Sequence, residues 1–288
     1  MATDFNRRFT VRAGAALSLL GAGLLAGCDT TGSTRAPVAR APQYAEVRAD
    51  DPAATKANIE SLTETIRRSP TSGAFLTRGN AYATAGRFGE AIADFSEAIK
   101  LEPNNAAAFT NRALAERQTN RADAALADFD QAVTVNPRHA PAYLGRANLL
   151  RAQGNLDQAL GDLDQAIRLN PEQAQAFHAR GLIHQIRGDH TRAITDFDNA
   201  IDRDPFAAAP YFARGQSLLA ANKVDQAVED FNASLNVDNR NPAAWVWLGQ
   251  AYEKQGNRAK ASESYGRALT LDPANVAAKS GAARLKPA

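Results

Sequence analysis

The sequence predicts an all-α protein, a solenoid of stacked helical hairpins. Three observations predict this fold: an unbroken 34-residue period, two helix-length apolar stretches in every period, and small residues at fixed places in both stretches. A period of this length is typical of repeats that cannot bury their apolar faces alone and therefore stack on their neighbours.

The second stretch of each period carries the clearest columns. Alanines recur every 34 residues with no insertion or deletion, at Ala91, Ala125, Ala159, Ala193, Ala227 and Ala261. Four residues later stand bulky side chains, at Phe95, Phe129, Leu163, Phe197, Phe231 and Tyr265. Proline follows twelve residues after each alanine except in the fifth unit, and it is expected to end the helix.

The first stretch is equally regular. An aromatic residue precedes each alanine by sixteen residues, at Phe75, Phe109, Tyr143, Phe177, Tyr211 and Trp245, and a small residue follows it by four. Between the two stretches lies a residue that tolerates the left-handed conformation found at helix ends: Gly86, Asn120, Gly154, Gly188, Asn222 and Gly256.

In this order the columns resemble the tetratricopeptide repeat, over residues 72–275. The resemblance implies a right-handed α-solenoid of six tandem helix-turn-helix repeats, with a concave face lined by the first helices. It also implies that this face binds other proteins or extended peptide segments. The repeats are expected at residues 72–105, 106–139, 140–173, 174–207, 208–241 and 242–275.

Both ends of the array are expected to be capped. Leu62, Ile66 and Pro70 repeat the spacing of a second helix, so residues 52–71 predict an N-terminal capping helix. Residues 276–288 begin a seventh unit and stop, which predicts a C-terminal capping helix and a tail.

The N-terminus is typical of a secretory leader. Three arginines within the first 12 residues precede an uncharged apolar run over 13–26, which is too short to span a bilayer as a mature helix. The run closes on Leu25-Ala26-Gly27-Cys28, which resembles the bacterial lipobox. We expect a signal peptide over residues 1–27 and lipidation of Cys28; the alternative is an ordinary signal peptide with an accidental cysteine.

Residues 28–51 are polar, rich in Thr, Ala and Pro, and lack apolar periodicity, so they predict a disordered tether behind the lipidated cysteine. The expected location is the bacterial cell envelope, with the repeats in the periplasm and a lipid anchor as the only membrane attachment. The sequence does not choose between the inner and the outer membrane, and it leaves the oligomeric state open.

A comparison of the six units with one another reveals a paired column. Units one to five carry an arginine before the small residue and an aspartate sixteen residues later, and in unit six both change, to Leu248 and Ser264. We predict a structural arginine–aspartate ladder, with one rung in each repeat or with each rung reaching the next unit instead; the alternative is a row of arginines for an anionic partner. The pairs are Arg78 with Asp94, Arg112 with Asp128, Arg146 with Asp162, Arg180 with Asp196, and Arg214 with Asp230.

The register also predicts which side chains face the groove. Four of the six residues in one column are amides, which both donate to and accept from the main chain of a peptide. The alternative is that these side chains form ordinary solvent-exposed helix surface with no binding role. Trp247 either faces a partner or packs on the C-terminal cap. The predicted groove residues are Leu76, Asn80, Leu114, Arg117, Leu144, Asn148, Arg151, His178, Gln185, Phe212, Gln216, Val246, Trp247 and Gln250.

The sequence argues against other classes of function. Without residues 1–27 the chain carries 30 basic and 30 acidic residues, so no net positive charge favours nucleic acid. No Cys/His cluster or nucleophile motif is present, which predicts no metal, no cofactor and no enzyme. The expected function is a protein-binding adaptor of the cell envelope; the alternative is a lipoprotein that binds a small molecule or a glycan.

Overall fold

The computed structural model describes residues 52–285. The predicted signal peptide, the lipidated Cys28, the tether over residues 28–51 and the final residues 286–288 lie outside the described residues. Within the described part the chain forms α-helices joined by short turns, and no strand occurs there. The predicted all-α solenoid is therefore confirmed.

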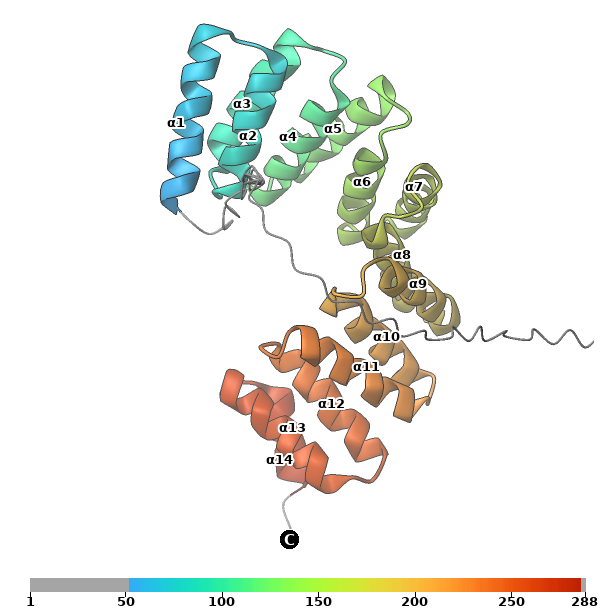
Figure 1. The fold of residues 1–288 in the computed structure, drawn as a ribbon. Coiled ribbons are helices and arrows are strands. Elements are labelled where there is room, and N and C mark those ends of the chain that lie inside the picture. Colours follow the sequence, from blue (N-terminus) through green and yellow to red (C-terminus); the bar gives the residue numbers. More distant parts are fainter. Residues whose placement is uncertain (1–51, 286–288) are drawn as a thin grey trace, which may run out of the picture. The chain divides into compact units, whose positions relative to one another are not determined.

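Six helical hairpins make up the body of the array (Figure 1). They follow α1 (Pro52–Arg68) and precede α14 (Val276–Arg284). The hairpins are α2 (Ser72–Thr84) with α3 (Phe88–Leu101), α4 (Ala106–Gln118) with α5 (Ala122–Val135), α6 (Ala140–Ala152) with α7 (Leu156–Leu169), α8 (Ala174–Ile186) with α9 (His190–Arg203), α10 (Ala208–Ala220) with α11 (Val224–Val237), and α12 (Pro242–Lys254) with α13 (Arg258–Leu271).

Helix ends follow the local rules read from the sequence. Each turn inside a hairpin contains one residue at positive φ, a glycine in four hairpins and Asn120 or Asn222 in the other two. Asparagine side chains cap several first helices; Asn105 accepts from the Ala108 amide at 3.0 Å, and Asn275 accepts from the Ala278 amide at 3.0 Å. Such caps satisfy amides that have no partner within the helix.

The small residues let the two helices of a hairpin touch. A Cβ added to Gly79 would lie 2.5 Å from the Phe95 ring, and one added to Gly181 would lie 2.6 Å from the Phe197 ring. Phe95 and Phe197 are themselves fully buried, as are the other bulky residues of their column. Glycine at these places is therefore required by close packing of the two helices.

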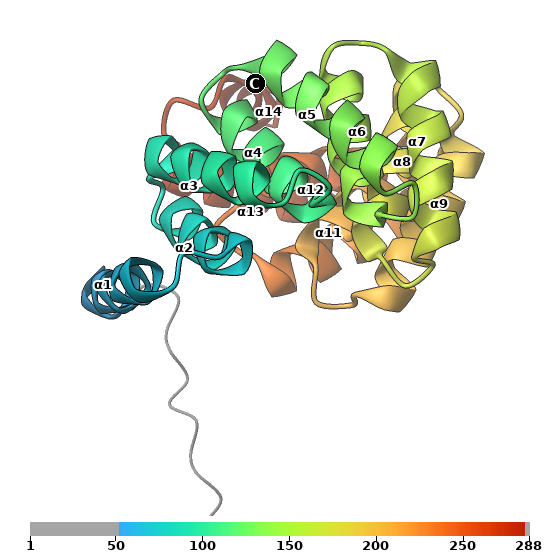
Figure 2. The same cartoon turned by 90° about the horizontal axis from the view of Figure 1, so that it is seen from above.

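The helices form an inner and an outer layer. Every first helix contacts the first helix of the next repeat, from α2 with α4 through to α12 with α14, whereas the second helices do not contact one another. The first helices therefore form the more closely spaced inner layer. The helical hairpins of residues 52–285 wind around a common centre (Figure 2). We call the surface of this layer the inner wall.

Candidate functional site

Each arginine of the predicted ladder bonds the aspartate of its own repeat. Arg146 donates from Nε and Nη2 to the two carboxylate oxygens of Asp162, both at 2.7 Å, which is the two-pronged geometry that suits a guanidinium. The same paired bonds, all between 2.6 and 2.9 Å, join Arg78 to Asp94, Arg112 to Asp128, Arg180 to Asp196, and Arg214 to Asp230. Each rung thus ties the first helix of a repeat to its second helix.

The remaining guanidinium nitrogen reaches the preceding repeat. Nη1 of Arg146 donates to Asp130 on α5 at 2.8 Å. In the same way Arg180 bonds Asp164 at 2.7 Å, Arg214 bonds Asp198 at 2.6 Å, Arg112 bonds Ser96 at 3.0 Å, and Arg78 bonds Thr63 of the capping helix at 3.1 Å. The ladder therefore links consecutive repeats as well as the two helices inside each one.

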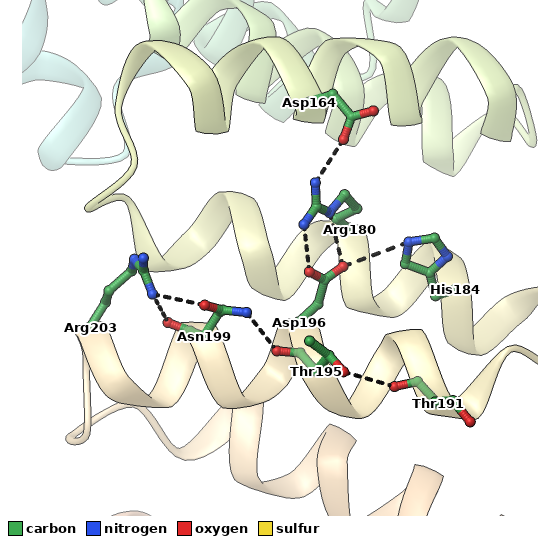
Figure 3. Close-up of polar contacts among 8 residues, drawn as sticks. All are labelled: Asp164, Arg180, His184, Thr191, Thr195, Asp196, Asn199 and Arg203. Carbon is green, nitrogen blue, oxygen red and sulfur yellow. Dashed lines mark hydrogen bonds and ion pairs between the residues drawn. The ribbon is translucent and has the colours of Figure 1, made fainter.

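Figure 3 shows one such junction on the outer side of the array. Arg180 on α8 lies between Asp164 of α7 and Asp196 of α9, and His184 Nε2 lies 3.7 Å from Asp196 on the same helix pair. Each of the three guanidinium nitrogens of this arginine donates to an aspartate oxygen. Its pKa is raised, chiefly by the hydrogen bonds that it donates to Asp196, so it stays charged at any physiological pH.

The ladder occupies the arginines that the alternative interpretation assigned to an anionic partner. Three of them, Arg146, Arg180 and Arg214, each bond two carboxylates. The aspartates within the repeats are buried, and each arginine also lies within 5.8 Å of the aromatic ring one turn earlier in its helix. This geometry is structural, since it leaves no positive charge to offer.

The sixth repeat shows how the rung is replaced. Leu248 takes the place of the arginine and is only 2% exposed, packed in the hydrophobic cluster at the C-terminal end. Ser264 takes the place of the aspartate and donates to the main-chain oxygen of Lys260 at 2.8 Å. Neither side chain is left with an unmet hydrogen bond, so the two changes compensate each other.

The inner wall is most open in the first two repeats. A cavity of about 360 Å³ lies between α2 and α4, and Asn80, Leu114 and Arg117 line it. Leu114 is 37% exposed, and Asn111 donates to Asn80 at 2.8 Å across the two helices. Further along, Leu144, Asn148, Arg151, Leu182, Gln216 and Gln250 are half-buried.

Some residues expected on the wall are committed to the protein's own packing. Val246 is buried at 5% exposure in the C-terminal hydrophobic cluster, which corrects its assignment to the groove. Gln185 donates to the Ala213 carbonyl at 3.1 Å and to the Ser217 hydroxyl at 3.0 Å, so its amide ties α8 to α10. Phe212 packs its ring 6.0 Å from Phe231.

Trp247 also packs against the protein's own core. Its ring centroid lies 6.3 Å from that of Phe231 on α11, in the preceding repeat. The equivalent Gly145 likewise faces the ring of a preceding second helix, that of Phe129. This column therefore points back along the array, and Trp247 also packs against the C-terminal hydrophobic cluster that includes Ala278 of the cap helix α14.

Arg151 and His178 lie close together on the wall, in repeats three and four. Arg151 is near enough to His178 to lower the pKa of that imidazole, although burial against Phe197 is the larger cause; together they bring it to about 4. His178 is therefore neutral at physiological pH. Leu76, the first residue of the same column, is half-buried against the core of the first hairpin.

Comparison with known proteins identifies the repeats. A family model for the tetratricopeptide repeat matches residues 76–142, 144–208 and 212–276. The chain belongs to the tetratricopeptide-repeat family. No curated protein matches the chain at the sequence level.

Solved structures share the tetratricopeptide-repeat architecture. The APC/C hetero-tetramer Cut9-Hcn1 superposes with a TM-score of 0.71 at 18% identity, covering 81% of this chain and 46% of that chain. The pilF protein of Pseudomonas aeruginosa gives 0.69 at 16% identity, covering 74% and 97%. The type IV pilus biogenesis factor PilW gives 0.66 at 17% identity, covering 73% and 97%. This chain spans less than half of the Cut9-Hcn1 chain, and identities this low show the fold alone.

Sequence reasoning missed the second partner of each ladder arginine. Asp130, Asp164 and Asp198 stand 34 residues apart, so the same comparison of tetratricopeptide repeats could have found them. It also missed Glu116, which is buried beside Asp128 and whose pKa is raised by that burial. Among residues 52–285 no cluster of side chains suits a metal ion, and no helix there is long and apolar enough to cross a membrane.

Proposed function

We propose that this protein is a non-catalytic scaffold of the bacterial cell envelope that holds segments of partner polypeptides on its inner wall. Tetratricopeptide-repeat proteins bind other proteins or peptides, and their stacked repeats present an extended concave surface for this purpose. The anchoring part of the proposal is supported by the leader-like N-terminus and by the lipobox resemblance at Cys28, ahead of a polar segment that suits a tether.

The open wall at α2 and α4 is the observation that carries the proposal. Its cavity combines the amides of Asn80 and Asn111 with the apolar surface of Leu114. Amides meet the donors and acceptors of an extended main chain, while the leucine offers contact area to a side chain of the partner. The cavity is partly open rather than enclosed, which suits a segment of polypeptide better than an enclosed small molecule.

Site-specific photo-crosslinking in intact cells tests the binding surface. A photoreactive residue is placed at Asn80, Asn148 or Gln216 on the wall, and at the exposed Gln131 on the outer helix α5 as a matched control. We expect the wall positions to yield crosslinked polypeptides that mass spectrometry identifies and that the control does not yield. Equal yields from Gln131, or none from any wall position, would refute the proposal.

Membrane fractionation tests the anchor separately. We expect the native protein to sediment with membranes and to incorporate radiolabelled palmitate. The variant Cys28→Ser should lose the label and move to the soluble fraction. A Cys28→Ser protein that stays in the membrane fraction would show that another segment anchors it.

A further inference from the structure

The inner wall carries positive charge that no ion pair among residues 52–285 neutralises. Arg117 on α4 and Arg151 on α6 occupy the same column, one repeat apart. Among residues 52–285 neither side chain forms an ion pair or a hydrogen bond, in contrast to the five ladder arginines. The wall thus differs from the outer side of the array, where arginine and aspartate are matched.

No carboxylate on the first helices competes for these two arginines. The only acidic residues of α2, α4, α6, α8, α10 and α12 are Glu116 and Glu253. Glu116 lies on the ladder side, beside Asp128 and Arg112. Glu253 is held by Arg284 of α14 at 2.7 Å and accepts from the Tyr265 hydroxyl. The wall of repeats two and three is therefore positive with no internal counter-charge.

Both arginines are placed to receive a carboxylate. The Nε of Arg151 is buried and finds no acceptor among the described residues, which is an unfavourable state that an incoming oxygen would relieve. Arg117 lines the 360 Å³ cavity together with Leu114 and the amide of Asn80. An acidic side chain that entered this cavity would find a guanidinium and an amide to bond, and apolar surface for its methylenes.

The spacing of the repeats sets the spacing of the acids. Neighbouring packed helices are about 8–10 Å apart, and α4 contacts α6 directly (Figure 1). A chain in the polyproline II conformation advances about 3.1 Å per residue with three residues per turn, so residues i and i+3 face the same side and lie about one repeat apart. Successive carboxylates on a segment that runs across the helices should therefore be about three residues apart to meet Arg117 and Arg151 together.

We propose that the partner segment held by the inner wall is acidic, with two carboxylate side chains about three residues apart that bond Arg117 and Arg151. This inference rests on the proposed function, since it names the chemistry of the polypeptide that the wall binds. The ladder arginines take no part in it, because their donors are already bonded to aspartate.

Binding of defined peptides to the full chain in detergent tests the inference. The probe is a fluorescein-labelled ten-residue peptide of Ser, Ala and Leu with two glutamates three residues apart, followed by fluorescence anisotropy. Two control peptides carry the glutamates side by side or replaced by glutamine. A hydrogen-bonded charge contact is worth enough that we expect each control peptide to bind at least about tenfold more weakly. Affinity for the acidic peptide should also fall as salt rises, because partly exposed charges are screened.

Matched protein variants complete the test. Arg117→Gln and Arg151→Gln should each weaken binding of the acidic peptide by about tenfold and leave the affinity for the glutamine peptide unchanged. Arg138→Gln removes the same charge from an exposed turn and should change neither affinity. Circular dichroism and thermal unfolding of each variant confirm that the fold is kept.

The outcomes separate this inference from the proposed function. Equal affinity for the acidic and the glutamine peptides would overturn the inference that the bound segment is acidic. An affinity for the acidic peptide that neither arginine variant changes would overturn it as well. In both cases the wall remains a peptide-binding surface. Failure of the whole peptide series to bind would also overturn this inference. The crosslinking experiment in cells then decides the proposed function independently.

Discussion

Replacing Asp162 with alanine tests whether the ladder holds the repeats together. Arg146 bonds both Asp162, whose side chain is 10% exposed, and Asp130, which is 54% exposed. Removing one partner of a buried ion pair costs about 3–5 kcal/mol because the other charge stays buried, whereas an exposed pair is worth about 0–1 kcal/mol. We expect Asp162→Ala to lower the free energy of unfolding by about 3 kcal/mol, at the low end because Asp130 remains, and Asp130→Ala by less than about 1 kcal/mol.

The double variant Arg146→Leu/Asp162→Ser supplies the decisive comparison. It copies the sixth repeat, where Leu248 is buried and Ser264 bonds the main chain, so we expect it to lie within about 1 kcal/mol of the native protein. Urea unfolding followed by circular dichroism gives the free energies. Because repeats can open separately, hydrogen exchange should place the loss in α6 and α7.

Two results would refute this reasoning. The first is that Asp162→Ala and the double variant lose the same stability, which would mean that the lost contacts matter and the stranded charge does not. The second is that Asp130→Ala costs as much as Asp162→Ala, which would mean that burial of the aspartate is irrelevant.

Two further predictions concern packing and pH. Gly181→Ala would place a Cβ 2.6 Å from Phe197 and should destabilise the protein by about 1–3 kcal/mol, whereas Gly161→Ala on the open side of α7 meets no atom and should stabilise it by up to about 1 kcal/mol; thermal unfolding distinguishes the two. The hydrogen bonds from Arg284 lower the pKa of Glu253 in the folded protein. These bonds therefore stabilise the docking of α14 fully above the ordinary glutamate pKa of about 4.3. The stabilisation is lost as the pH falls through the lower pKa of the folded state. Hydrogen exchange of α14 between pH 6 and pH 3, roughly the range of that titration, should show this loss, and Glu253→Gln should abolish its pH dependence.

The repeat architecture and the rungs of the ladder could be predicted because they recur in one chain. Arg112 and Asp128 stand sixteen residues apart, as do the residues of the four other pairs. Two antiparallel helices joined by a turn of constant length bring residues at this separation side by side. The 34-residue period also predicted which residue of each hairpin turn adopts a positive φ, including Asn120 and Asn222. In each case a local rule, repeated without change, determined the geometry.

The availability of the wall residues could not be predicted in the same way. Register gives the direction of a side chain but not how deeply the next helix covers it. Val246 and Gln250 stand four residues apart on α12, yet the first is buried in the cluster around Phe231 while the second keeps part of its surface. The packing of α12 against its neighbours, which the register does not give, determines this difference.

Trp247 shows the same limit. The sequence predicted that Trp247 either faces a partner or packs on the C-terminal cap, and it did not indicate a contact with the preceding repeat. The direction became clear only from the packing of Gly145 on Phe129 and of Trp247 on Phe231, both in the preceding repeat.

The third arginine bond makes the internal joints interchangeable. Arg146, Arg180 and Arg214 each donate from Nη1 to an aspartate of the preceding repeat. The acceptors Asp130 and Asp164 are therefore chemically equivalent. If residues 140–173 were excised in frame, Arg180 would meet Asp130 in place of Asp164 and the joint would re-form. The array can therefore lengthen or shorten by whole units while its end helices stay the same, and the span of peptide that it holds can be adjusted in steps of one repeat.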